Sequence, residues 1–186
     1  MKSGHRWIIV VVVIVTALAV IEASMGRLPL GPDGKFGWWE GDVHSRENSQ
    51  RVADAYSFSH IIHGMAFYGL LWLVARRLRV TTRFAIAVAI EAGWELLENS
   101  PIIINRYREA TIALGYVGDS ILNSTSDLLM MSIGYFLAGK LPVRVTLAAV
   151  LIMEIGCAVW VRDNLTLNII MLIHPIEAIK AWQSAG

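Results

Sequence analysis

The chain has little of what disulfide-rich, nucleotide-dependent or nucleic-acid-binding proteins depend on. A single cysteine, Cys157, excludes an intramolecular disulfide framework. Charged residues make up only 17% of the 186 residues, and the net charge of +1 provides no basic surface for nucleic acid. There is no GxGxxG loop, P-loop or CxxCH haem motif. We therefore expect neither a nucleic-acid partner nor a nucleotide or haem cofactor.

Hydrophobic residues, in contrast, make up 55% of the chain, which is enough for about five transmembrane helices of about 20 residues each. At about 1.5 Å per residue the apolar runs are long enough to cross about 30 Å of hydrocarbon, the third only barely so. They lie at residues 7–24, 57–75, 84–99, 121–139 and 142–161. The sequence therefore predicts an all-α fold, a polytopic membrane helix bundle that forms a single membrane domain over residues 1–186.

Two segments leave an alternative open. Ala17 and Ala19 form a small-x-small site after an apolar stretch that follows Lys2 and Arg6, so residues 1–19 fit either part of a span or a cleaved signal peptide. The last apolar stretch, 165–179, is short and is interrupted at Pro175. We expect it to form an interfacial or re-entrant helix.

The distribution of charge predicts the orientation of the bundle, because Lys and Arg are retained on the cytoplasmic side. Residues 1–6, 76–83 and 140–144 together hold eight of the sixteen Lys and Arg and none of the fifteen acids. This places the N-terminus in the cytoplasm, the C-terminus in the periplasm, and the chain in the inner membrane of a bacterium. The long outer loops are then residues 25–56 and 100–120.

Ionisable residues inside the predicted spans are costly and are usually functional. They share helical spacings: His60 and His63; Glu91, Glu95 and Glu98; Asp119, Asn123 and Asp127. Counted from the outer ends, His63, Glu95, Asp127 and Glu154 lie about 7–10 Å deep. Four helices therefore place acid or imidazole groups at one level, which predicts a single site in the outer half of the bilayer.

These residue types predict acid–base chemistry or the binding of a metal ion. The candidate catalytic residues are His60, His63, Glu91, Glu95, Asp119, Asn123 and Asp127. A divalent metal is the one cofactor they suggest, with His60, His63, Glu95 and Asp127 as ligands. Arg106, Tyr107 and Arg108, in the second outer loop, are candidates to bind a phosphate or carboxylate headgroup. The alternative is that these groups only form hydrogen bonds between helices. Glu22 and Glu98, near the ends of their spans, are expected to be solvated.

Three stretches carry a family resemblance: SQRVADAYSFSHIIHGMAFYGLLW (49–72), EAGWELLENSPIIINRYR (91–108) and GYVGDSILNSTSDLLMMSIGYFLA (115–138). With these residues the chain resembles a family of bacterial multi-pass inner-membrane proteins that is known only as a domain of unknown function. More distantly it is similar to VanZ-like membrane proteins. That pattern implies His60 or His63, Glu95, Arg106, Asp119 and Asn123 as the matching positions. The chain departs from it by having a serine where an Asp-Lys pair commonly precedes the histidine, and by a longer loop after the glutamate.

Three functions fit these observations. The first is an intramembrane enzyme that acts on a lipid-linked or envelope substrate, a lipid or a glycan. The second is a small-solute or cation-binding transporter component, and the third is a non-catalytic membrane scaffold. All three have membrane lipids as partners. The sequence leaves open whether the protein is an enzyme, its substrate and its oligomeric state.

Overall fold

A computed structural model of the protein describes residues 6–111, 113 and 115–185. These residues form helices and loops without any β-strand, apart from one isolated bridge between Trp39 and Ala53. The predicted all-α class is therefore confirmed. Residues 1–5, which belong to the predicted cytoplasmic stretch and to the alternative signal peptide, lie outside the described residues.

Five long helices correspond to the five predicted apolar runs. They are α1 (Arg6–Ser24), α2 (Ser57–Val74), α3 (Val80–Glu98), α5 (Ile121–Lys140) and α6 (Val143–Val161). Three shorter helices are α4 (Pro101–Ala110), α7 (Leu165–Ile173) and α8 (Glu177–Ser184). The prediction of one short C-terminal helix over 165–179 was wrong, since this region contains α7 and the start of α8. The break falls around Pro175, which has no amide proton to donate within a helix.

Within the described residues, three helices, α1, α2 and α6, are long and apolar enough to cross a membrane. This is fewer than the five spans predicted. The difference arises from composition and not from length, since α3 and α5 have 19 and 20 residues. Helix α3 contains Arg83 and three glutamates, and the first two turns of α5 contain an asparagine, two serines and Asp127. Much of this polarity is turned inward, because Glu91, Glu95, Asn123 and Asp127 are all buried.

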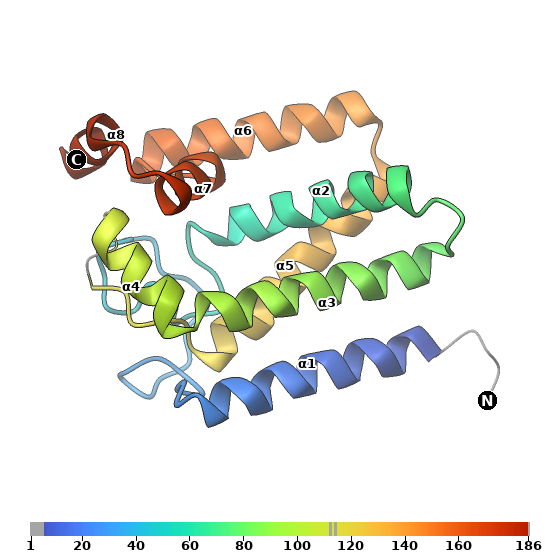
Figure 1. The fold of residues 1–186 in the computed structure, drawn as a ribbon, viewed down its shortest axis with the longest axis horizontal. Helices are drawn as coiled ribbons and strands as arrows, with labels where there is room; N and C mark the ends of the chain where they lie inside the picture. Colours follow the sequence, from blue (N-terminus) through green and yellow to red (C-terminus); the bar gives the residue numbers. More distant parts are fainter. Residues whose placement is uncertain (1–5, 112, 114, 186) are drawn as a thin grey trace.

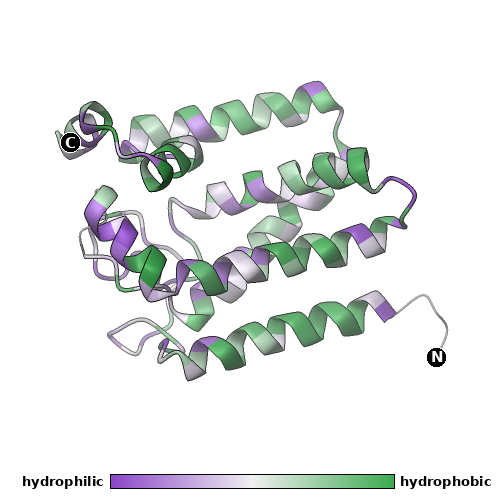
Figure 2. Ribbon diagram, in the orientation of Figure 1, coloured by the Kyte–Doolittle hydropathy of each residue, from purple (hydrophilic) through white to green (hydrophobic). Residues whose placement is uncertain are grey.

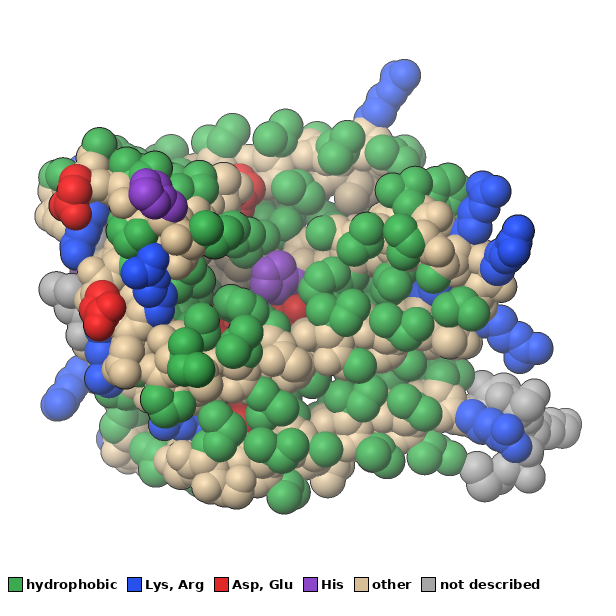
Figure 3. All heavy atoms as spheres, viewed as in Figure 1, with side chains coloured by type: hydrophobic (Ala, Val, Ile, Leu, Met, Phe, Trp, Pro, Cys, Tyr) green, Lys and Arg blue, Asp and Glu red, His purple; other side chains and the backbone are tan. Residues whose placement is uncertain are grey.

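The long helices run side by side, and the two ends of the bundle differ (Figure 1). The described start of the chain and the connections α2–α3 and α5–α6 lie at one end, whereas the long loops, α4, α7, α8 and the C-terminus lie at the other. Hydrophobic residues dominate the helices between these ends (Figure 2). In the view of Figure 3, Lys and Arg project from the end with the short connections, and no Asp or Glu is seen there.

Helices α2 and α5 are the most closely packed pair in the bundle, because a glycine of each lies against the backbone of the other. Gly64 lies against Met131 and Tyr135 of α5, and Gly134 lies against Ile61 of α2. Small residues let helix backbones approach closely. Close van der Waals packing stabilises helix pairs in lipid, where the hydrophobic effect does not drive their association. This pair carries His60 and Asp127 toward the same point.

The C-terminal helices are tied to the bundle by one buried carboxylate. Asp163 accepts hydrogen bonds from Tyr56 Oη (3.1 Å), Asn168 Nδ2 (3.0 Å) and Gln183 Nε2 (3.0 Å). It therefore joins α7 and α8 to the segment that precedes α2. Burial is the main cause that raises the pKa of Asp163 from 3.8 to about 6.

This raised pKa predicts how the docking of α8 depends on pH. The folded state binds the Asp163 proton more tightly than the unfolded state, so stability falls as the pH rises between about 4 and about 6. We expect the amides of α8 to have higher hydrogen-exchange protection factors at pH 5 than at pH 7.5, and Asp163→Asn to remove the difference. An equal pH dependence in Asp163→Asn would show that another group is responsible.

Candidate functional site

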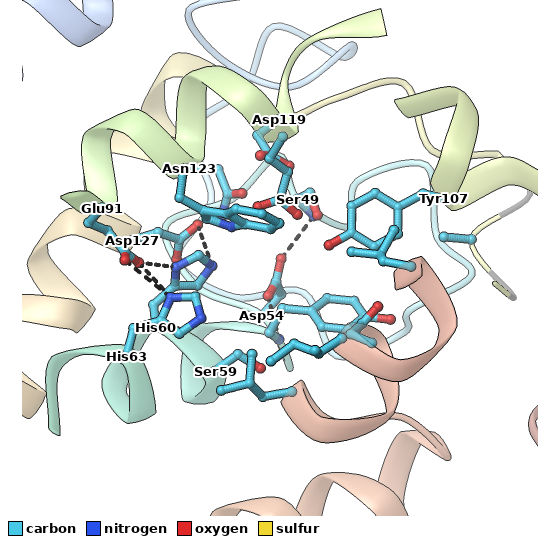
Figure 4. Close-up of a pocket in the computed structure, with 18 of the residues that line it drawn as sticks. Ser49, Asp54, Ser59, His60, His63, Glu91, Tyr107, Asp119, Asn123 and Asp127 are labelled. Carbon is cyan, nitrogen blue, oxygen red and sulfur yellow. Dashed lines mark hydrogen bonds and ion pairs between the residues drawn. The ribbon is translucent and has the colours of Figure 1, made fainter. Parts of the chain in front are cut away.

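A cavity of about 300 Å³ lies in the half of the bundle nearer to the long loops. Helices α2, α3, α4, α5 and α7 and the loops before α2 and α5 contribute to its wall (Figure 4). Its polar lining is acidic, with Asp54, Glu91, Glu98, Asp119 and Asp127. Among the described residues that line it there are two histidines and no Lys or Arg.

His60 lies at the centre of the acidic groups. Its Nδ1 is 2.6 Å from Glu91 Oε1 and 3.5 Å from Glu95 Oε1, and its Nε2 is 3.7 Å from Asp127 Oδ2. The short contact assigns the Nδ1 proton to a hydrogen bond that Glu91 accepts. His60 is therefore held by α3 on one side and faces α5 on the other, as Figure 4 shows.

His63 shares the carboxylate of Glu91. Its Nδ1 lies 3.0 Å and 3.1 Å from the two Glu91 oxygens. The side chain is 18% exposed, and in Figure 4 its second ring nitrogen is turned away from Glu91, toward the cavity. A carboxylate that fixes one imidazole nitrogen and leaves the other free is the arrangement of a general base.

Glu95 and Asp127 have carboxylate oxygens without partners. Neither oxygen of Glu95 makes a hydrogen bond, and the nearest partner is His60 Nδ1, 3.5 Å from Glu95 Oε1. Asp127 Oδ1 also has no hydrogen-bond partner, whereas Asp127 Oδ2 lies 3.7 Å from His60 Nε2. Both side chains are buried. Buried polar groups are normally satisfied, so these oxygens need a partner.

A second polar group surrounds Asn99 at the end of the bundle nearer to the long loops. Its amide nitrogen donates to Glu22 (3.2 Å), Asp119 (3.2 Å) and Ser124 (3.1 Å), and its side-chain oxygen accepts from the Asp119 amide (2.7 Å). Burial raises the pKa of Asp119 well above its usual range. Glu22 is fully buried. The expectation that it is solvated was wrong, because Asn99 and the loop before α5 cover the end of α1.

The structure brings the predicted catalytic residues together, but it pairs His63 with a different glutamate from the one expected. His60, His63, Glu91, Asp119, Asn123 and Asp127 line the cavity, and Glu95 lies behind it against His60. Sequence depth had placed His63 level with Glu95, but the structure joins His63 to Glu91, one helical turn away. Glu154, expected at the same level, instead accepts the backbone amides of Leu165 and Thr166 at the start of α7.

The predicted headgroup-binding residues separate. Tyr107 lines the cavity, whereas the two arginines beside it do not. Arg106 donates to the carbonyl oxygens of Leu172 and Ile173 at the end of α7, and Arg108 donates to that of Tyr116. Both guanidinium groups therefore contact backbone carbonyls outside the cavity lining, and headgroup binding by Arg106 and Arg108 stays a prediction.

Two acidic residues that line the cavity, Asp54 and Glu98, were not predicted to belong to the site. Asp54 is buried in the cavity wall, where it accepts the amides of Ser49 (2.9 Å) and Tyr56 (2.8 Å). Glu98, expected to be solvated at the end of α3, also lines the cavity. The spacing of Glu98 from Glu91 and Glu95 on one helical stripe was a usable signal, whereas Asp54 lies in a loop and had none.

Comparison with known proteins identifies the family. The model of the family described as "Protein of unknown function (DUF2585)" matches residues 22–185. The chain belongs to this family. The DUF2585 match begins near the end of α1 and includes every residue of the cavity.

Several UPF0314 proteins are similar to the chain over almost its full length. One from Rhizobium etli is 51% identical over 177 residues, covering 95% of this chain and 91% of the relative. One from Sphingopyxis alaskensis is 50% identical, covering 99% and 97%, and one from Paracoccus denitrificans is 45% identical, covering 99% and 94%. No solved structure matches the chain.

Proposed function

We propose that this member of the DUF2585 family is an intramembrane enzyme of the bacterial inner membrane that acts on a lipid-linked envelope substrate. The bundle crosses the membrane five times in this proposal, with the basic end in the cytoplasm and the cavity in the outer half of the bilayer. Three apolar helices and the difference in charge between the two ends support this placement. Helices α3 and α5 are then spans whose polar faces are turned toward the cavity.

The opening of the cavity supports a substrate that enters from the lipid. Loop residues Asn48, Ser49, Ala113 and Tyr116 contribute to its lining. The lining also includes apolar side chains of α2, α3 and α7, namely Phe67, Ile90, Trp94, Ile169 and Leu172. Figure 3 shows a histidine and a carboxylate in a hollow between hydrophobic side chains on the flank of the bundle. A polar site with such a lining is suited to a polar group carried on a lipid tail.

The observation that carries the enzymatic proposal is the pair formed by Glu91 and His63. Glu91 fixes the Nδ1 side of the imidazole at 3.0 Å, and the other nitrogen is free to take a proton from water or from a substrate hydroxyl. Tyr107, Asn123 and Asp127 supply donors and acceptors around it. The VanZ-like pattern does not carry this proposal, because Arg106, one of its matching positions, donates a hydrogen bond to α7 and does not line the cavity.

The test compares the lipids and envelope glycans of a deletion strain that carries the wild-type gene, His63→Gln or His44→Gln. His44 is exposed in the first loop and is the matched control. We expect wild type and His44→Gln to restore the profile, and His63→Gln to leave the deletion phenotype although it is present in the membrane at normal level. Restoration by His63→Gln, or an unchanged profile in the deletion strain, would overturn the proposed function.

A further inference from the structure

Three buried side chains from three helices converge at the wall of the cavity. His60 of α2, Glu95 of α3 and Asp127 of α5 each offer one nitrogen or oxygen atom, and these atoms all lie within 4.8 Å of one another. The three residues are at most 6% exposed. Imidazole and carboxylate together are ligands that zinc and neighbouring divalent metals accept.

The carboxylates of this group lack the partners that burial requires. Both Glu95 oxygens and Asp127 Oδ1 are buried without a hydrogen bond, and no described Lys or Arg lines the adjoining cavity. An ionised carboxylate without a compensating cation is strongly unfavourable inside a protein. A divalent cation between these groups would remove that cost.

The orientation of His60 is the one that a metal ligand needs. Glu91 accepts the Nδ1 proton at 2.6 Å, which leaves the lone pair of Nε2 directed at Asp127. The 3.7 Å from Nε2 to Asp127 Oδ2 is too long for a hydrogen bond. It is close to the spacing of about 3.4 Å that two tetrahedral ligands have when each lies about 2.1 Å from a zinc ion.

We propose that His60, Glu95 and Asp127 bind one divalent transition-metal ion, Zn²⁺ or Mn²⁺, with Glu91 as the residue that positions His60. Asp127 also lines the cavity, so the ion has a coordination position that faces a substrate. The role of the ion rests on the proposed function, but its binding does not and can be measured alone.

The experiment measures metal in the full-length protein purified in detergent from cells supplied with zinc and manganese. We expect one ion per chain in the wild type and in His44→Ala, and less than a tenth of that in Glu95→Gln and in Asp127→Asn. These substitutions preserve side-chain size, and an unchanged elution volume and helical circular dichroism establish that each variant is folded. Zn²⁺ added to stripped wild type should raise its unfolding temperature, and Zn²⁺ added to Glu95→Gln should not.

Two results would overturn the metal site: wild-type protein without metal that is not stabilised by Zn²⁺ or Mn²⁺, or equal metal content in Glu95→Gln. If either result is obtained while His63→Gln fails to restore the lipid profile, the metal site is refuted and the proposed function stands. Stoichiometric metal combined with an unchanged profile in the deletion strain removes the function and leaves the metal site.

Discussion

Replacement of His60 by alanine is expected to lower the free energy of unfolding by about 3–5 kcal/mol, the range seen when removal of one partner leaves a buried charge uncompensated. The imidazole lies between Glu91 at 2.6 Å, Glu95 at 3.5 Å and Asp127 at 3.7 Å. Without it, Glu95 and Asp127 lose the imidazole that lies beside both of them, and Glu91 keeps only its contact with His63. At about 2–4 °C per kcal/mol for a chain of this size, thermal unfolding in detergent should shift down by roughly 6–20 °C.

His63→Ala is the matched control for this prediction. His63 is one turn along the same helix, but it contacts only Glu91 among the acids and is partly exposed. Its loss should cost about 1.5–3 kcal/mol, the value of one hydrogen bond to a charged group. Adding Glu91→Gln to His60→Ala should restore part of the stability, because it removes the charge of one of the three carboxylates. Equal unfolding temperatures for His60→Ala and His63→Ala would contradict the central role of His60.

The positions of the long helices could be predicted because each one coincides with a hydrophobic run of similar length in the sequence. The predicted run 57–75 and α2, Ser57–Val74, agree almost residue for residue. For α3 the run began at residue 84, whereas the helix begins at Val80. Hydropathy follows transfer to lipid, and the backbone hydrogen bonds of a helix extend through Thr81, Thr82 and Arg83 regardless of it.

The pairing within the site was less predictable than its membership. A spacing of four residues places Glu91 and Glu95 on one face of α3, but only the vertical offset between α2 and α3 decides which of them meets the histidines. That offset depends on side-chain packing between helices, which spacing along one chain does not contain. An error of four residues corresponds to about 6 Å along a helix, enough to exchange the partner of His63.

Loop residues were the least predictable part of the site. Asp54 reaches the cavity because the first loop is fastened to the second, by Gln50 Nε2 bonded to the Gly118 carbonyl (2.8 Å) and by the Ser120 amide bonded to the Ser49 carbonyl (3.1 Å). These contacts join residues about 70 positions apart. No local pattern signals them, since neither hydrophobic periodicity nor charge marks the participants.

The close approach of α2 and α5 predicts that Gly64→Ala disrupts both the fold and the site. A Cβ at position 64 would overlap the Met131 carbonyl oxygen and lie 2.6 Å from the Tyr135 amide nitrogen, both backbone atoms of a packed helix. Backbone cannot move aside as a side chain can, so the helices must separate. We expect destabilisation at the upper end of the range of about 1–3 kcal/mol typical of overpacking.

Gly69→Ala, on the same helix, is the control, because a Cβ there would have no neighbouring atom within 4 Å. It should unfold at the wild-type temperature or slightly above, since alanine is the better helix former. His60 and Asp127 lie on the two helices that Gly64→Ala would push apart, so this variant should also lose the bound metal while Gly69→Ala retains it. Wild-type stability and metal content in Gly64→Ala would show that the α2–α5 contact is looser than the structure has it, and that the site does not depend on it.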